Sequence, residues 1–273
     1  MSEPQVFIVA TPIGNKSDLS PRAIETLKSA DVIACEDCRT SSKLLDSYNI
    51  TNKLVSYHKF NEKQRTAEFL KMIEDNKKIA LISDAGTPCI SDPGRVLVNE
   101  LFNNGVKITS IPGASAIITF LSMIPKNTEE FAFVGFLPRT KPAQQKVFEK
   151  FKDIDTVFYE SPNRLIETLE NIKDTLGSET KIAVGRELTK VFEEVKYGSV
   201  EEIIEFYQTN ILKGEIVFVV YAKEQKADED NTEIEAKIKK LKELDFSDGD
   251  ISRIISSLYD INKNKVYKLA LKL

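Results

Sequence analysis

The chain has 273 residues, of which 41% are hydrophobic and 29% are charged, proportions that are ordinary for a globular protein. Its formal net charge of −4 excludes a broadly basic surface, so any contact with nucleic acid must be local. No apolar run reaches membrane-spanning length, and the first residues lack the basic and apolar segments of a signal sequence. We therefore expect a cytoplasmic protein without a membrane partner.

The cysteine content argues against a disulfide framework, because three cysteines in a chain of this length leave an odd one. Cys35 and Cys38 form a C-x-x-C pair, but a zinc site would need two further ligands. Only Cys89 and His58 remain to supply them. We expect no bound metal.

The chain up to about residue 122 repeats a strand, a loop and a helix. Ser20 followed by Pro21 is typical of a helix start. The short apolar runs that predict strands are residues 6–10, 32–34, 54–57, 79–82 and 106–111. This repeat predicts an α/β domain over residues 1–122, with a parallel sheet covered on both faces.

The strand pattern resumes after a hinge at residues 123–130. The expected strands are residues 131–136, 156–159, 181–184, 191–198 and 215–222, and the last ones lack a full helix between each pair. A mixed sheet fits this second domain, residues 123–223, better. Residues 224–273 are predicted to form a polar linker over 224–231 and a helical appendage, with helices near 232–244 and 248–258.

The loop after the apolar run of residues 79–82 is the first candidate for a site. It follows a strand of a parallel sheet, at the edge where open α/β sheets bind ligands. Ser83, Asp84 and Thr87 offer oxygens, while Gly86 and Gly94 allow the backbone to approach a ligand closely. A tight strand-to-helix connection with an aspartate cap is the simpler alternative.

The sequence lacks the motifs of several common binding sites and of covalent catalysis. Neither a phosphate-binding G-x-x-x-x-G-K-[ST] loop nor a dinucleotide-binding G-x-G-x-x-G loop occurs. Covalent catalysis has no obvious nucleophile, because acidic Glu36 and Asp37 beside Cys38 disfavour a thiolate. The small residues and carbonyls of several strand ends suit a compact ligand with little net negative charge.

Ten motifs in order resemble a known family. They are Thr11-Pro-Ile-Gly-Asn15, Glu36-Asp37-x-Arg39, His58-x-x-Asn61-Glu62, Ser83-Asp-Ala-Gly-Thr-Pro88, Asp92-Pro-Gly94, Pro112-Gly113, Gly135-Phe-Leu-Pro138, Tyr159-Glu-Ser-Pro-x-Arg164, Arg186-Glu-Leu-Thr-Lys190 and Lys213-Gly-Glu215. Residues 5–222 thus resemble the ribosomal RNA small subunit methyltransferase I family, the RNA branch of the tetrapyrrole methylase superfamily. The chain departs from the family at Cys38 and Ala114, where threonine and proline are usual.

The resemblance implies a two-domain methyltransferase that binds S-adenosylmethionine between its domains, as a homodimer. It also implies methylation of the ribose 2′-oxygen of a cytidine in the decoding region of 16S ribosomal RNA in the small subunit. Carried over by position, the cofactor-binding residues are Pro12, Ser83, Asp84, Ala85, Gly86, Thr87, Pro88, Ser115, Ala116, Tyr159, Glu187, Leu188 and Gly214.

The ribose hydroxyl must lose a proton, and acidic residues at the predicted strand ends are candidates for orienting or accepting it. The catalytic candidates are Glu36, Asp37, Arg39, Glu160 and Glu187. Two alternatives stay open at this point. Glu36 and Asp37 could simply pair with Arg39, and Glu187 could form an internal ion pair with Arg186.

Basic residues supply the candidate RNA contacts. Arg139 and Lys141 lie next to the rigid residues Pro138 and Pro142. They either bind RNA phosphate or are ordinary solvated charges. The end of the chain is basic, and its candidates are Arg253, Lys263, Lys265, Lys268 and Lys272. Two helices joined near Asp260 would resemble a helix-turn-helix, unless they form only a packed cap. The rival functions are a tetrapyrrole-precursor methyltransferase and a non-catalytic RNA-binding protein.

Overall fold

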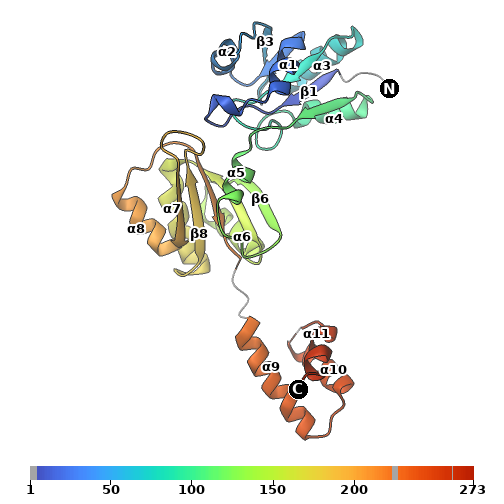
Figure 1. Ribbon diagram of the computed structural model, residues 1–273, viewed down its shortest axis with the longest axis vertical. Helices are drawn as coiled ribbons and strands as arrows, with labels where there is room; N and C mark the ends of the chain where they lie inside the picture. The colour runs from blue at the N-terminus through green and yellow to red at the C-terminus, as the bar shows by residue number, and fades with distance from the viewer. Residues whose placement is uncertain (1–4, 223–226, 260) are drawn as a thin grey trace. The chain divides into compact units, whose positions relative to one another are not determined.

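The computed structural model describes residues 5–222, 227–259 and 261–273. The chain divides into two compact units, Met1–Ala222 and Lys223–Leu273. The first unit contains two five-stranded sheets, and the described part of the second unit is helical (Figure 1). Among the described residues, no helix is both long enough and apolar enough to cross a membrane.

The first sheet is entirely parallel and has the strand order β3-β2-β4-β1-β5. Its strands are β1 (Val6–Val9), β2 (Val32–Cys35), β3 (Lys53–Ser56), β4 (Ile79–Leu81) and β5 (Ile108–Ile111). The helices between them are α1 (Pro21–Ser29), α2 (Cys38–Asp46), α3 (Glu62–Glu74) and α4 (Arg95–Asn103). The predicted parallel sheet is confirmed, and the carboxyl ends of all five strands meet at one edge.

Alternation along the central strands buries both faces of this sheet. In β2, Val32 and Ala34 belong to one core, whereas Ile33 and Cys35 belong to the core on the other face. The residues of β4 divide in the same way, and the whole of β2 is buried. Continuous apolar runs therefore form these strands, as expected for a parallel sheet covered by helices.

Short side chains begin the helices of this sheet. The Ser20 hydroxyl accepts a hydrogen bond from the backbone N–H of Ala23 (3.1 Å), with Pro21 in the first turn of α1. The Asp37 carboxylate accepts one from the backbone N–H of Arg39 (2.8 Å) at the start of α2. The apolar pattern alone leaves α2 unpredicted, because its nine residues bury only Ser41 and Leu45.

The second sheet is mixed, as predicted, with the order β6-β7-β10-β8-β9. Its strands are β6 (Phe131–Phe136), β7 (Asp155–Glu160), β8 (Lys181–Arg186), β9 (Glu194–Ser199) and β10 (Ile216–Val220). Only β6 and β7 pair in parallel. The helices α5 (Ala116–Ser122), α6 (Lys141–Phe151) and α7 (Pro162–Leu176) precede or connect these strands. The predicted domain boundary at residues 122 and 123 stays a prediction.

One expectation for this sheet is wrong. A full helix, α8 (Val200–Thr209), lies between β9 and β10, where the sequence pattern predicts none. Ser199 and Glu202 form a capping box at its start. The buried residues Val200, Ile203, Ile204 and Tyr207 follow helical spacing. The residues that identify this helix are therefore present in the sequence.

The second unit has a small core of its own. Its helices are α9 (Ala227–Glu243), α10 (Asp248–Tyr259) and α11 (Lys263–Ala270). The core consists of Ile234, Ile238, Ile251, Ile255, Val266 and Ala270. The predicted linker over residues 224–231 is too long, because α9 begins at Ala227. The predicted junction at Asp260 lies outside the described residues.

Candidate functional site

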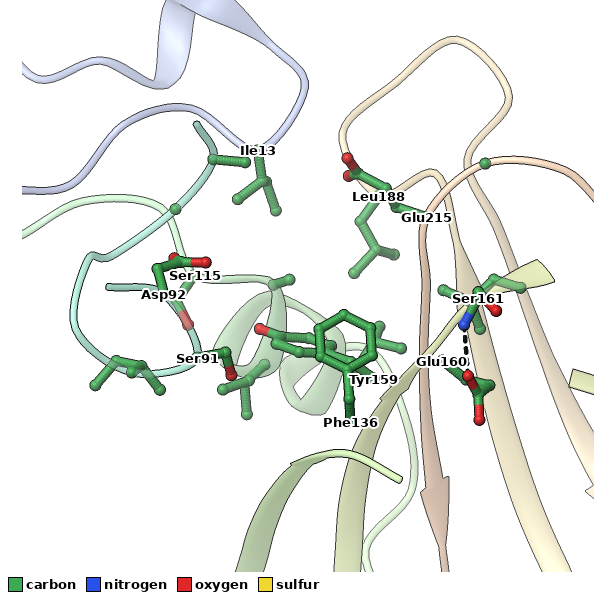
Figure 2. A pocket seen from close by; sticks show the side chains of 18 of the residues that line it. Ile13, Ser91, Asp92, Ser115, Phe136, Tyr159, Glu160, Ser161, Leu188 and Glu215 are labelled. Carbon is green, nitrogen blue, oxygen red and sulfur yellow. Dashed lines mark hydrogen bonds between the residues drawn. The ribbon is translucent and has the colours of Figure 1, made fainter. Parts of the chain in front are cut away.

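A cavity of about 400 Å³ lies in the first unit, at the carboxyl edge of the parallel sheet. Figure 2 shows residues of the first sheet's loops on one side, and Glu160, Ser161, Leu188 and Glu215 on the other. The lining residues are Ile13, Ala85, Gly86, Thr87, Ile90, Ser91, Asp92, Ser115, Ala116, Ile117, Phe136, Tyr159, Glu160, Ser161, Pro162, Leu188, Gly214, Glu215, Ile216 and Val217.

Hydrogen bonds join the three loops that form the first wall. Thr11 and Gly86 exchange backbone hydrogen bonds of 2.9 and 3.0 Å, which tie the loop after β1 to the loop after β4. The Thr11 hydroxyl also donates to the Ser83 carbonyl (3.0 Å). The Thr87 hydroxyl donates to the Ala114 carbonyl (3.2 Å) in the loop after β5. These hydrogen bonds therefore hold the three loops together as one wall.

Two glycines in the lining of the cavity have backbone conformations that disfavour any side chain. Gly86 has φ +78°, and a Cβ there would lie 3.3 Å from the Ile13 side chain. Gly214 has φ +95°, and a Cβ there would collide with the carboxylate of Glu187. Glycine at both positions keeps the backbone against the cavity.

Aromatic rings form part of the second wall. The rings of Phe136 and Tyr159 lie 5.5 Å apart (Figure 2). Burial raises the pKa of the Tyr159 phenol to about 12, with smaller contributions from Asp92 and Glu215. Tyr159 is therefore a neutral hydrogen-bonding group beside an apolar surface at ordinary pH.

Glu160 lines the cavity, but its carboxylate is already engaged. It accepts hydrogen bonds from the backbone N–H of Ser161 (2.8 Å) and the hydroxyl of Thr168 (3.0 Å). Arg164 completes the set with an ion pair of 3.2 Å. These partners satisfy a side chain that is fully buried. They fix its orientation and leave it poorly suited to accept a substrate proton.

Glu187 is also engaged, although it does not line the cavity. Burial alone would raise its pKa, but hydrogen bonds from Lys190 (2.8 Å) and from the backbone N–H of Glu215 (2.9 Å) hold the pKa below its ordinary value. Arg186 pairs with Glu194 (3.4 Å) instead. The alternative of a direct Arg186–Glu187 ion pair is therefore not what the structure contains.

The structure brings together most of the residues predicted for the cofactor. Those that line the cavity are Ala85, Gly86, Thr87, Ser115, Ala116, Tyr159, Leu188 and Gly214. Pro12, Ser83, Asp84, Pro88 and Glu187 do not line it. Ser83 instead shapes the loop, since its hydroxyl donates to the Ala85 carbonyl (3.2 Å). The assignment of a cofactor to these residues stays a prediction.

The predicted site leaves out Asp92 and Glu215, which supply carboxylates to the cavity lining. Both belong to sequences singled out for the family resemblance, Asp92-Pro-Gly94 and Lys213-Gly-Glu215. Burial raises the pKa of the Asp92 carboxyl, a hydrogen bond from Ser83 lowers it, and the charge of Asp84 raises it. Asp92 and Glu215 could therefore have been predicted as site residues from these two motifs.

A second cavity, an open surface hollow of about 450 Å³, contains the other predicted catalytic residues. It is lined by Glu36, Asp37, Cys38, Arg39, Ser56, His58, Lys59 and Phe60. Within the described chain, Arg39 makes no ion pair with Glu36 or Asp37, so that alternative is not observed. His58 is held by Asn61, whose side-chain oxygen accepts from the His58 backbone N–H (2.8 Å).

Three carboxyl groups connect the two cavities electrostatically. The pKa of Glu36 is raised by burial and by the charges of Asp84 and Asp92. Burial also raises the pKa of Asp84, whose oxygen accepts a hydrogen bond from the backbone N–H of Asp37 (3.3 Å). No cluster of three or more potential ligands among the described residues could hold a metal ion.

The raised pKa of Asp92 leads to a stability prediction. A carboxyl whose pKa is higher in the folded state stabilises folding at low pH, and this contribution is lost as the pH rises through the folded-state pKa. Asp92→Asn should therefore raise the melting temperature at pH 7, and the gain should shrink as the pH falls toward about 4. Calorimetry across this range would measure it. The exposed Asp75→Asn serves as the control, and an equal or larger gain there would contradict the prediction.

The candidate RNA-binding residues lie outside both cavities. Arg139 and Lys141 are exposed around the start of α6. In the second unit, Lys263, Lys268 and Lys272 are exposed, and Arg253 lies 3.9 Å from Asp250. The side chain of Lys265 lies outside the described residues. Phosphate binding by any of them stays a prediction.

Comparison with known proteins identifies the family. Residues 5–204 match the family model of Tetrapyrrole (Corrin/Porphyrin) Methylases. A relative from Mesorhizobium japonicum, named ribosomal RNA small subunit methyltransferase I, is 42% identical over 83% of this chain and 78% of its own. One of the same name from Synechocystis is 36% identical over 98% of both chains.

Solved structures share the fold at low identity. A diphthine synthase superposes with a TM-score of 0.63 and 16% identity, over 80% of this chain and 89% of its own. A Thermus thermophilus uroporphyrin-III C-methyltransferase, complexed with S-adenosyl homocysteine, gives 0.54 and 17%, over 79% and 97%. The predicted α/β fold class and the family resemblance are confirmed. From the family match and the relatives, this chain belongs to the tetrapyrrole methylase family.

Proposed function

We propose that this protein is an S-adenosylmethionine-dependent methyltransferase of small-subunit ribosomal RNA. The observation that carries the proposal is its similarity to relatives named ribosomal RNA small subunit methyltransferase I, at 36–44% identity. The structural neighbours named for tetrapyrrole chemistry are only 15–19% identical. Coverage of 98% of the Synechocystis relative includes the helical second unit, which favours the RNA enzyme over a tetrapyrrole enzyme.

The proposed acceptor is the ribose 2′-oxygen of a cytidine in the decoding region of 16S ribosomal RNA. This finer assignment rests on the ten motifs that the chain shares with the family. Mass spectrometry of nucleosides from ribosomal RNA tests it directly. RNA from cells lacking the gene should have lost one 2′-O-methylcytidine, and expression of the gene should restore it. An unchanged nucleoside profile would refute the assignment.

The cofactor is proposed to lie in the first cavity, against Gly86, Ser115 and Tyr159. When bound, it would supply an electrophilic methyl group on a sulfonium. Backbone groups of the hydrogen-bonded loops suit such a cation, because they stabilise it without an ion pair that methyl transfer would break. The aromatic faces of Phe136 and Tyr159 provide a further surface that attracts cations.

The protein's main contribution to the rate is proposed to be alignment. Holding two reactants in line contributes roughly 7–11 kcal/mol in favourable cases. Asp92 is the better-placed proton acceptor for the hydroxyl, because it lines the cavity and its pKa is raised. Glu160 and Glu187 each accept hydrogen bonds from two fixed donors, whereas Ser83 is the one hydrogen-bond donor among the groups that shift the pKa of Asp92.

A cofactor titration separates this proposal from a non-catalytic RNA-binding protein. Calorimetry should detect one S-adenosylmethionine per chain, with the same affinity in the presence of a chelator. Methyl transfer to a uroporphyrinogen-type substrate should be undetectable. Absence of cofactor binding would favour the non-catalytic alternative, and transfer to the tetrapyrrole would favour the other.

We further propose a cytoplasmic homodimer, from the family resemblance. Light scattering should give twice the chain mass of 30.8 kDa at micromolar concentration. A mass equal to that of one chain would contradict the dimer.

A further inference from the structure

The second cavity lies next to the first along the edge of one sheet. It is formed by the segments that follow β2 and β3, namely residues 36–39 and 56–60. Strand β2 pairs with β4, and the loop after β4 contributes Ala85, Gly86 and Thr87 to the first cavity. Because all these strands are parallel, both cavities open at their carboxyl ends. A molecule in one cavity would therefore be close to a molecule in the other.

A direct contact also links the two cavities. The backbone N–H of Asp37, in the second cavity, donates to Asp84 beside the first (3.3 Å). Asp92, which lines the first cavity, interacts electrostatically with Glu36, which lines the second. The two cavities are therefore neighbours, with Asp37 and Asp84 in contact between them.

The lining of the second cavity includes an aromatic ring that is exposed to solvent. Phe60 is 93% exposed, which places it among the most exposed large apolar side chains of the described residues. Its segment is nevertheless ordered by hydrogen bonds. The Phe60 backbone N–H donates to His58 Nδ1 (3.3 Å), and the Asn61 amide donates to the Ser56 carbonyl (3.0 Å). An exposed ring on a fixed loop is a platform on which a nucleic-acid base can stack.

Charged groups of both signs surround this ring. Arg39 and Lys59 are exposed, and neither forms an ion pair within the described part of the chain. The Asp37 carboxylate caps α2 through the Arg39 backbone N–H. The Glu36 carboxylate differs, because no described group donates a hydrogen bond to it. The cavity therefore offers two cations, one ring and one available carboxylate.

We propose that this second cavity holds the acceptor nucleotide, and that Glu36 selects cytosine. The base stacks on Phe60, its N4 amino group donates to the Glu36 carboxylate, and Arg39 and Lys59 contact the adjoining phosphates. Carboxylates accept from the cytosine amino group, whereas the O4 oxygen of uracil repels them. This inference rests on the proposed methyltransferase function and assigns its RNA subsite.

Placing the base in the second cavity allows the protein to recognise the base and to methylate the ribose in two separate places. Sequence-specific proteins read single-stranded RNA by stacking unpaired bases and bonding their edges. With the base in the second cavity, the attached ribose lies toward Asp92 and the first cavity. The base would then set specificity while the hydroxyl faces the methyl donor.

The first test concerns Glu36. Methyl transfer is measured on small subunits that carry either cytidine or uridine at the modified position, once that position has been mapped. Wild type should prefer cytidine, and Glu36→Gln should reduce the cytidine-to-uridine ratio of kcat/KM by roughly fivefold to tenfold. The amide loses the charge that repels uracil and can donate to its O4. The matched control, Glu100→Gln on the exposed surface of α4, should leave the ratio unchanged.

The second test concerns Phe60. Phe60→Ala should lower kcat/KM for subunits by about 5- to 150-fold, mainly through KM, because stacking on the base is lost. Phe60→Trp should restore most of the activity. Phe102→Ala removes another exposed ring, 81% exposed. It lies near the end of α4, a helix that runs from the carboxyl edge of the sheet to its amino edge, so activity should persist.

Cofactor affinity separates failure of this inference from failure of the proposed function. All five variants should bind S-adenosylmethionine like wild type. An unchanged cytidine-to-uridine ratio in Glu36→Gln, with kcat reduced on both acceptors, would assign Glu36 to the hydroxyl and overturn base selection. Wild-type KM in Phe60→Ala would overturn the stacking site. A wild-type protein that neither binds cofactor nor methylates RNA would instead refute the proposed function.

Discussion

A Gly86→Val variant should bind S-adenosylmethionine about a hundredfold more weakly than the wild type, because valine disfavours the backbone at φ +78°. A Cβ would also press against Ile13, which lines the same cavity, at 3.3 Å. Left-handed backbone costs a non-glycine residue ~1–2 kcal/mol per position, and crowding adds ~1–3 kcal/mol. The loop is expected to relieve both by moving into the cofactor's space. Calorimetry measures the affinity.

Gly105→Val provides the matched control. Gly105 also has positive φ, at +66°, but a Cβ there would meet nothing within 4 Å. It follows α4, at the edge of the sheet opposite the cavity. Valine there should therefore lower the stability of the protein without weakening cofactor binding. Circular dichroism would check that both variants are folded. Equal, wild-type affinity in both would place the cofactor outside the first cavity.

The sequence predicts the first sheet well because its strands carry an unambiguous signal. The apolar runs of β2 and β4 are short and continuous, as expected where both faces are buried. The helix α8 is missed although its capping box and the helical spacing of its buried residues are present in the sequence. The helix α2 buries too little to be detected from hydrophobicity.

The candidate site is predictable only where one loop supplies several residues. The residues Ala85, Gly86 and Thr87 lie together in sequence and together in the cavity. By contrast, the engagement of Glu160 by Thr168 and Arg164, and of Glu187 by Lys190, depends on side-chain directions that no motif states. The separation of Glu36 from Asp92 into two cavities depends on strand order, since β2 and β4 are neighbours only in the folded sheet.

The second large effect is expected at the end of the chain, where charge is concentrated. Residues 250–273 hold five basic residues against two acidic residues, in a chain of net charge −4. The apolar residues of α10 and α11 are buried in their own small core, while Lys263, Lys268 and Lys272 are exposed. We propose that these lysines contact RNA phosphates, as helices of this kind often do.

Replacing these three lysines together with glutamine should weaken binding to unmodified small subunits without changing cofactor affinity. Each lost phosphate contact reduces the slope of log affinity against log salt by roughly 0.7 to 0.9, so the slope should fall by about 2 to 3. Affinity would be measured across a salt series by filter binding, alongside methyl incorporation. Glutamine keeps helix propensity close to that of lysine, so the second unit should remain folded.

A matched triple variant distinguishes local contact from general charge. Lys28, Lys43 and Lys71 are exposed on helices of the first unit, and their replacement with glutamine changes the net charge equally. If steering by net charge alone mattered, both variants would lose affinity to the same degree. If the end of the chain contacts phosphate, only the first variant should show the smaller salt slope. An unchanged slope in that variant would leave α10 and α11 as a packed cap, which the core of Ile251, Ile255 and Val266 would be sufficient to explain.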